Sequence, residues 1–311
     1  MALIWLLIGF VTLFISGNWL VKGSVELSRH FKISTLVIGL TVVAFGTSAP
    51  ELFVSIKAAY NGVPDLAVGN IVGSNIANIG LILGLVAMMM PIPIRNRNIR
   101  FDWGVMMLST ILLILFIQNG VLGLWEGLTF LVALGLYLFW SLYQSRRKHS
   151  QSGETILKPS YPLYLAILVV VISVTGLYFG AEWLVKGAVE LAERWGVSDR
   201  VIGISIVAFG TSIPELATSV IAIFKKENDI SVGNIVGSNI FNIWAVLGAT
   251  AVIRPLPVTN AHVLTADILW SAAFAILLLL FMLPLSNGNI TRTKGAFMFF
   301  LYIAYIYLLF R

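Results

Sequence analysis

Two stretches of this chain, residues 39–94 and 203–258, are copies of one segment. At a constant offset of 164 residues, 29 of the 56 aligned positions are identical, and no gap is needed. A segment that occurs twice predicts a fold built from two related halves. Each copy also carries a glutamate, Glu51 or Glu215, inside an apolar stretch. A carboxylate at bilayer depth costs at least roughly 2.5–3.5 kcal/mol on insertion scales, so such residues indicate a functional site.

The chain is too apolar for a water-soluble protein. Hydrophobic residues make up 59% of its 311 residues and charged residues only 11%, and the mean hydropathy is +0.94. A soluble protein of this composition could not cover its surface with polar atoms. The net charge of +6 suits basic loops that face anionic lipid. The chain has no solvated basic tract of the kind that binds nucleic acid. We therefore predict an integral membrane protein with lipids as partners, no nucleic-acid partner and no obligatory protein partner.

Apolar segments predict ten transmembrane helices, five before and five after the polar stretch 145–160. Because five is an odd number, the second half must enter the membrane inverted relative to the first. The expected fold is all-α, with a first repeat at 1–144, a cytoplasmic linker at 145–160 and a second, inverted repeat at 161–311. The expected spans are 2–28, 34–60, 65–90, 101–118, 121–144, 161–193, 199–224, 229–253, 263–284 and 294–310.

The positions of lysine and arginine predict the orientation. With the amino terminus outside the cell, 13 of the 20 basic residues fall in inner loops and 5 in outer loops. Inner loops of membrane proteins carry the excess of lysine and arginine. Both termini are therefore predicted to be extracytoplasmic.

The polar residues shared by the two copies begin at a predicted helix break. Pro50 lacks the N–H that would bond to the Gly46 carbonyl, so the second helix should break there and free carbonyls near Ala44. Thr47 and Glu51 are four residues apart and share one helical face. The second copy repeats these elements with Thr211, Ser212, Pro214 and Glu215.

The next helix of each copy adds neutral oxygen atoms. Ser74 and Asn78 are four residues apart, and Ser238 and Asn242 repeat the pair. Alone, such small polar residues are typical of helix packing. Together with two glutamates they form a set of hard oxygen donors, and the chain has no cysteine. Oxygen sites suit alkali and alkaline-earth cations, whereas transition metals prefer nitrogen and sulfur. We predict such a cation site at the membrane midplane.

The motifs VAFGTSAPEL with VGNIVGSNIANI, and VAFGTSIPEL with VGNIVGSNIFNI, resemble the paired α-repeats of the cation/Ca²⁺ exchanger superfamily. They are most similar to those of prokaryotic sodium/calcium exchangers. The resemblance implies a secondary antiporter of the prokaryotic inner membrane, not an enzyme, that exchanges Ca²⁺ for Na⁺ by alternating access. It implies no cofactor besides these transported ions. The implied ion ligands are Glu51, Glu215, Thr47, Thr211, Ser48, Ser212, Ser74, Ser238, Asn78 and Asn242, with the backbone carbonyls of Ala44 and Ala208.

Asn242 stands where several members of this superfamily carry aspartate, so two titratable groups remain in the expected site. A Ca²⁺/H⁺ exchanger that uses the same two glutamates is therefore the main alternative. A cation channel would use similar oxygens but usually builds its pore from rings of identical subunits. A membrane-embedded metalloenzyme would need an open metal position with a base nearby, and no HExxH or comparable cluster occurs.

Overall fold

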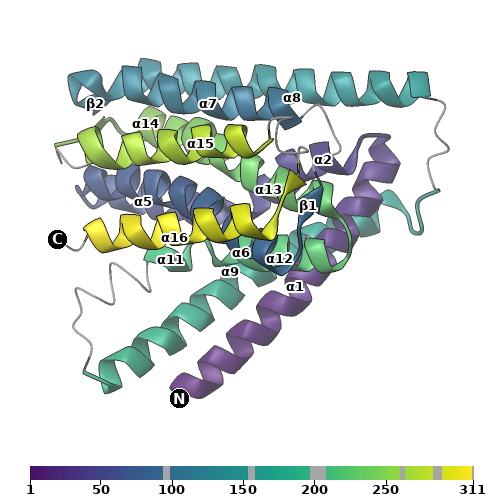
Figure 1. Ribbon diagram of the computed structural model, residues 1–311, viewed down its shortest axis with the longest axis horizontal. Coiled ribbons are helices and arrows are strands. Elements are labelled where there is room, and N and C mark those ends of the chain that lie inside the picture. Colours follow the sequence, from purple (N-terminus) through teal and green to yellow (C-terminus); the bar gives the residue numbers. More distant parts are fainter. Residues whose placement is uncertain (94–98, 153–157, 197–207, 260–262, 283–288, 310–311) are drawn as a thin grey trace. The chain divides into compact units, whose positions relative to one another are not determined.

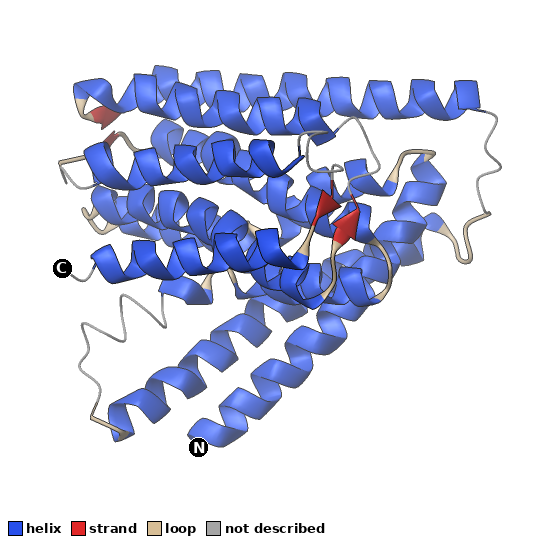
Figure 2. Cartoon of the chain, viewed as in Figure 1, coloured by secondary structure: helices blue, strands red, loops and turns tan. Residues whose placement is uncertain are grey.

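The computed structural model describes residues 1–93, 99–152, 158–196, 208–259, 263–282 and 289–309. Helices account for nearly all of the described residues (Figure 2). Those of the first half are α1 (Ala2–Phe31), α2 (Thr35–Ile38), η1 (Gly39–Val43), α3 (Ala44–Thr47), α4 (Ala49–Tyr60), α5 (Pro64–Ala77), η2 (Asn78–Leu83), α6 (Gly84–Met89), α7 (Ile99–Phe116), η3 (Ile117–Asn119) and α8 (Leu124–Ser152).

The described helices of the second half follow in a similar order (Figure 1). The expected span 199–224 begins in residues that lie outside the described part of the chain. The described helices are α9 (Leu163–Arg194), α11 (Ala208–Gly210), α12 (Ile213–Phe224), α13 (Asn228–Phe241), η5 (Asn242–Leu247), α14 (Gly248–Ile253), η6 (Val263–Asp267), α15 (Ile268–Met282) and α16 (Arg292–Leu309).

Two antiparallel pairs of very short strands connect helix ends. Strand β1 (Ile92–Pro93) pairs with β4 (Asn289–Ile290), and β2 (Val121–Leu122) pairs with β3 (Leu256–Pro257). Each pair joins one strand from the first half to one from the second. The strands satisfy backbone hydrogen bonds where the helices end.

Seven of the described helices are long and apolar enough to cross a membrane, or eight when a bent pair is counted as one span. The bent pair is Thr35–Thr47 with Ala49–Tyr60. The short apolar helix α12 adds a further apolar segment of less than spanning length. The expectation of an all-α membrane protein is thus confirmed in this coarser form, and the ten-span layout stays a prediction.

Contacts divide the described chain into two compact units. The first unit comprises Met1–Pro50 and Ser141–Asn234, and the second comprises Glu51–Trp140 and Ile235–Arg311. Each unit therefore combines segments from both sequence repeats. The divisions between the units fall inside α4, α8 and α13, and two of these helices, α4 and α13, carry repeated motifs.

Helix α8 continues to Ser152 and so extends into the polar stretch 145–160. Its residues Arg146 to Lys148 are good helix formers, which allows the helix to continue past its apolar part. The Ser145 hydroxyl accepts a hydrogen bond of 2.8 Å from the backbone N–H of Ser34. This contact meets the chain where α2 begins, since Ser34 is the N-cap of α2.

Helices α1 and α9 lie side by side and antiparallel in the first unit (Figure 1). Glycines bring their backbones together: a Cβ on Gly9 would lie 2.5 Å from the backbone nitrogen of Leu184 and 2.8 Å from the Gly180 carbonyl oxygen. A Cβ on Gly187 would similarly lie 2.7 Å from the backbone nitrogen of Leu6. Such distances do not admit any side chain, so small residues set the spacing of this pair.

We expect Gly9→Ala to destabilise the protein, because the new methyl group forces the α1 and α9 backbones apart. Overpacking of this kind typically costs about 1–3 kcal/mol. Gly135→Ala in α8 is the matched control, since its Cβ would meet no described atom within 4 Å and alanine is the better helix former. Thermal unfolding of the purified variants in detergent measures the change in stability that each substitution causes. Equal midpoints for Gly9→Ala and Gly135→Ala would contradict the close packing.

Candidate functional site: two broken helices and an asparagine network

The expected helix break is present in the first copy. Helix α3 ends at Thr47, α4 begins at Ala49, and the two segments are bent by 43°. Ser48, between them, has φ −82° and ψ 4°. The cause is local, because Pro50 cannot donate to the carbonyl four residues before it.

The second copy breaks in the same way. Helix α11 ends at Gly210, α12 begins at Ile213, and Ser212 has φ −88° and ψ 3°. Ser48 and Ser212 thus adopt nearly the same sparsely populated backbone conformation. Glu51 and Glu215 both fall in the first turn of the helix that follows the break. The amino-terminal end of a helix carries partial positive charge, which stabilises a nearby carboxylate.

The first unit brings three of the expected ligand residues into hydrogen-bonding relations. The Ser48 hydroxyl donates to Oε1 of Glu215 at 3.4 Å. The Thr47 hydroxyl donates to Oδ1 of Asn234 at 3.0 Å. Thr47, Ser48 and Glu215 are all buried. Ser48 and Glu215 come from different sequence repeats, so the two motifs contact each other directly.

Asn234 is a central residue that the sequence argument missed. Its Oδ1 accepts from the Thr47 hydroxyl, and its amide nitrogen donates to the backbone carbonyl of Glu215 at 3.4 Å and to the Ser219 hydroxyl at 3.1 Å. Asn234 thereby connects both broken helices within the first unit. The signal was available, because Asn234 and Ser219 repeat Asn70 and Ser55 at the same offset of 164.

The expected release of the Ala44 carbonyl is not observed. This oxygen accepts from the backbone N–H of Ser48 at 3.0 Å and from the Thr47 hydroxyl at 3.3 Å. The helix holds its regular bonding up to Ser48 and bends only there, so the break lies one turn later than this carbonyl. Ala208 begins α11, and Thr211 lies in the turn after it.

The second unit holds Glu51 and the polar residues of the next helices. Glu51, Asn78, Ser238 and Asn242 are fully or almost fully buried, and Ser74 is 4% exposed. Asn78 and Asn242 each begin a π-helical turn, η2 and η5. π-helical turns inside α-helices occur frequently at functional sites. The two sequence copies therefore share a backbone irregularity at the same residue.

The donor set consists of carboxylates, hydroxyls and amide oxygens in both units. Such atoms bind hard cations such as Na⁺ and Ca²⁺. Glu51 and Glu215 are both fully buried, and a buried carboxylate needs a compensating partner.

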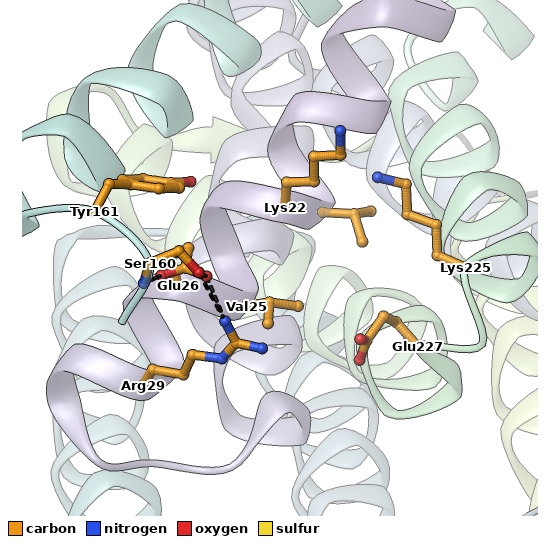
Figure 3. A pocket seen from close by; sticks show the side chains of 9 residues that line it. Lys22, Val25, Glu26, Arg29, Ser160, Tyr161, Lys225 and Glu227 are labelled. Carbon is orange, nitrogen blue, oxygen red and sulfur yellow. Dashed lines mark hydrogen bonds and ion pairs between the residues drawn. The ribbon is translucent and has the colours of Figure 1, made fainter. Parts of the chain in front are cut away.

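A separate cavity of about 490 Å³ lies in the first unit. Lys22, from α1, and Lys225, at the end of α12, extend toward the same space (Figure 3). Glu26 contacts Arg29 and accepts from the backbone N–H of Ser160 at 2.6 Å. Glu26 thus connects the end of α1 to the segment before α9.

Two groups at this cavity titrate abnormally. Burial lowers the pKa of Lys225, and the nearby positive charge of Lys22 lowers it further. Burial raises the pKa of Glu227, and Asp229 adds to this effect, whereas Arg29 and Lys225 oppose it. Both shifts have the sign that desolvation of a charged group produces.

Comparison with known proteins agrees with this arrangement. A family model for "Sodium/calcium exchanger protein" matches residues 1–143 and 165–311. CaxA of Alkalimonas amylolytica, a provisionally assigned antiporter, is 40% identical over 99% of this chain and 98% of its own length. The sodium/calcium exchanger MaX1 of Methanosarcina acetivorans is 30% identical over 98% of this chain and 97% of its own. A solved structure of the sodium-calcium exchanger NCX_Mj superposes with a TM-score of 0.84 at 32% identity, over 98% of this chain and 97% of that one.

Helices long and apolar enough to span a membrane, together with buried carboxylates next to helix breaks, are typical of an integral membrane ion transporter. The chain belongs to the sodium/calcium exchanger family. The recognition of the cation/Ca²⁺ exchanger superfamily from the two motifs is thereby confirmed.

Proposed function

We propose that this protein is a secondary active antiporter that exchanges Ca²⁺ for Na⁺ by alternating access. The observation that carries the proposal is the repeated placement of a buried glutamate, Glu51 or Glu215, in the first turn after a broken helix. Two carboxylates balance the charge of one Ca²⁺. Without a bound cation, the two uncompensated carboxylates oppose the change between the outward-open and inward-open states. The carrier therefore returns only with a cation bound, which couples the movement of one ion to that of the other.

The proposed ligands are the two glutamates together with neutral oxygens. Na⁺ and Ca²⁺ would compete for the same atoms, because both prefer oxygen ligands. Asn234 is not itself a proposed ligand; it orients the ligand Thr47 by accepting a hydrogen bond from its hydroxyl. Besides the two glutamates, the proposed ligands are Thr47, Ser48, Thr211, Ser212, Ser74, Ser238, Asn78 and Asn242, with the carbonyl of Ala208. The Ala44 carbonyl is left out, because its oxygen already accepts two hydrogen bonds within the helix.

We propose that the chain crosses the membrane ten times, as inverted repeats at 1–144 and 161–311 joined by a cytoplasmic linker, with the broken helices at the midplane. Inverted repeats of this kind are common in transporters that bind their substrate at the midplane. Helices α1 and α9 would move together as a pair. Their close glycine contacts and the hydrogen bond between Glu26 and Ser160 support this rigid coupling.

We propose a location in the prokaryotic inner membrane, with lipids and the transported ions as partners and no obligatory protein partner. The excess of lysine and arginine in alternate loops supports extracytoplasmic termini. A single cysteine in the linker, Ser150→Cys, tests this orientation because the chain has no cysteine of its own.

We expect Ser150→Cys to react with a membrane-impermeant maleimide only after the cells are opened. Asn61→Cys, in the loop between α4 and α5, is the matched control and should react in intact cells. Asn61 is exposed, which makes it a suitable reporter. Labelling of Ser150→Cys from outside, with Asn61→Cys protected, would invert the proposed topology.

Saturable Ca²⁺ uptake into proteoliposomes that needs a counter-ion on the opposite side tests the antiporter as such. An antiporter changes back to the state that faces the Ca²⁺ side only with an ion bound, so uptake should cease when the counter-ion is absent. Uptake that continues without any counter-ion would support a cation channel, whose sites bind weakly enough for free passage.

A further inference from the structure

Four buried asparagines form a hydrogen-bonded network inside the second unit: Asn75, Asn78, Asn239 and Asn242. Asn75 and Asn78 lie three residues apart, on one face of α5 and η2. Asn239 and Asn242 lie at the corresponding places in α13 and η5. The family resemblance implies Asn78 and Asn242 as ion ligands and gives no role to Asn75 or Asn239.

The hydrogen bonds of the network run between the two sequence repeats. The Asn78 amide nitrogen donates to Oδ1 of Asn239 at 3.1 Å. The Asn242 amide nitrogen donates to Oδ1 of Asn75 at 3.0 Å. Each expected ligand is thus held through its nitrogen by the unassigned asparagine of the other repeat.

The direction of both hydrogen bonds follows from atoms that only accept. The Asn75 amide nitrogen faces the backbone carbonyl of Asn239 at 3.2 Å, and a carbonyl cannot donate. The oxygen of Asn75 must therefore face Asn242, which has to donate. The Asn239 amide nitrogen faces the Met106 thioether sulfur at 3.4 Å, and this sulfur also only accepts. The oxygen of Asn239 therefore faces Asn78.

This ordering leaves the same atom uncommitted in both expected ligands. Oδ1 of Asn78 and Oδ1 of Asn242 are buried and accept no hydrogen bond from the described residues. Burying an amide oxygen without a partner costs free energy. A role in packing alone does not explain why two amide oxygens at equivalent places in the two repeats are buried without a hydrogen bond from the described residues. A cation is the natural partner for a buried oxygen dipole.

We propose that Asn75 and Asn239 are positioning residues, which hold the amides of Asn242 and Asn78 so that oxygen, and never nitrogen, faces the transported cation. The proposal rests on the proposed function, because it presumes that these amides bind Ca²⁺. Residues that orient a metal ligand are nearly as important as the ligand, and their loss typically lowers affinity by about 10–100-fold.

Asn75→Leu and Asn239→Leu test the proposal, because leucine keeps the volume and removes both hydrogen-bonding groups. Calorimetric titration of the detergent-purified full chain with Ca²⁺, without Na⁺, measures the affinity. We expect each variant to bind Ca²⁺ about tenfold more weakly, since the released amide then also populates the orientation that presents its nitrogen. If either leucine variant does not fold, Asn75→Ala and Asn239→Ala remove the same groups without added bulk.

A rescue separates positioning from packing. Aspartate at position 242 has oxygen on both sides and needs no orientation, so Asn75→Leu should change the Ca²⁺ affinity less than about twofold in the Asn242→Asp background. The matched pair is Asn239→Leu in the Asn78→Asp background. The crossed combinations, Asn75→Leu with Asn78→Asp and Asn239→Leu with Asn242→Asp, should keep the tenfold loss.

Equal losses in all four double variants would overturn the proposal, because a packing role does not depend on which amide was replaced. Leucine variants that bind Ca²⁺ like the parent would overturn it as well. Failure of the proposed function looks different: the unmodified chain itself would then not bind Ca²⁺. Thermal unfolding of every variant monitors the structural contribution separately.

Discussion

Replacing either buried glutamate with glutamine, Glu51→Gln or Glu215→Gln, should abolish Ca²⁺ transport while the protein remains folded and inserted. Glutamine keeps the shape of the side chain but leaves one negative charge to face a divalent cation. The attraction between two unit charges at 4 Å is about 4 kcal/mol at an effective dielectric constant of 20. A loss of this size corresponds to roughly a thousandfold in affinity.

Uptake of radioactive Ca²⁺ into proteoliposomes measures this effect. Glu193→Gln is the matched control, since Glu193 is exposed near the end of α9 and should be replaceable without loss. Gel filtration in detergent verifies that each variant is folded. Near-normal uptake by Glu51→Gln or Glu215→Gln would remove that residue from the proposed ligands.

The second large effect concerns the coupling ion. An outward-directed Na⁺ gradient should drive Ca²⁺ into proteoliposomes. Protons could drive exchange only by occupying the two glutamates, one each, which gives an electroneutral exchange. Na⁺ can use further subsites, because Thr47, Ser48 and Ser212 add neutral oxygens that protons would not need. This surplus of neutral oxygens favours Na⁺ over H⁺.

A membrane potential separates the two coupling ions. The three-for-one exchange that the family resemblance implies moves one net charge per cycle, worth about 2.3 kcal/mol per 100 mV. An inside-negative potential set with K⁺ and valinomycin should therefore oppose Na⁺ exit and lower Ca²⁺ accumulation by roughly 50-fold per 100 mV. Uptake that follows a pH gradient, ignores Na⁺ and does not respond to the potential would replace this assignment with Ca²⁺/H⁺ exchange.

The cavity beside Lys22 and Lys225 takes part in neither the glutamate prediction nor the coupling-ion prediction. It is lined by residues of α1, the segment before α9 and the turn after α12. Of the two acidic residues that line it, Glu26 forms an ion pair with Arg29 and accepts a hydrogen bond from the backbone N–H of Ser160. The cavity thus lies where the proposed moving pair of helices meets the helix that carries Glu215, since α1 also packs against α12.

The sequence alone determined the features that depend on local chemistry. Pro50 and Pro214 prevent regular helix bonding wherever they occur in the fold, so the breaks before both glutamates could be predicted from residue types. The apolar spans follow from composition and length, which the bilayer selects directly. The duplicated motifs identified the family, because they occur twice in the same order at one offset.

Only the tertiary structure decided which polar groups meet. Thr47 and Asn234 are 187 residues apart in sequence, and Asn242 and Asn75 are 167 apart. Helical periodicity states which face a residue lies on, but the partner across an interface depends on how two helices pack. The direction of an amide depends further on what its neighbours donate and accept, as at Asn75 and Asn239. The repeated motifs therefore predict the residue types of the proposed ligands, and the packing of helices from both repeats decides which way their amides point.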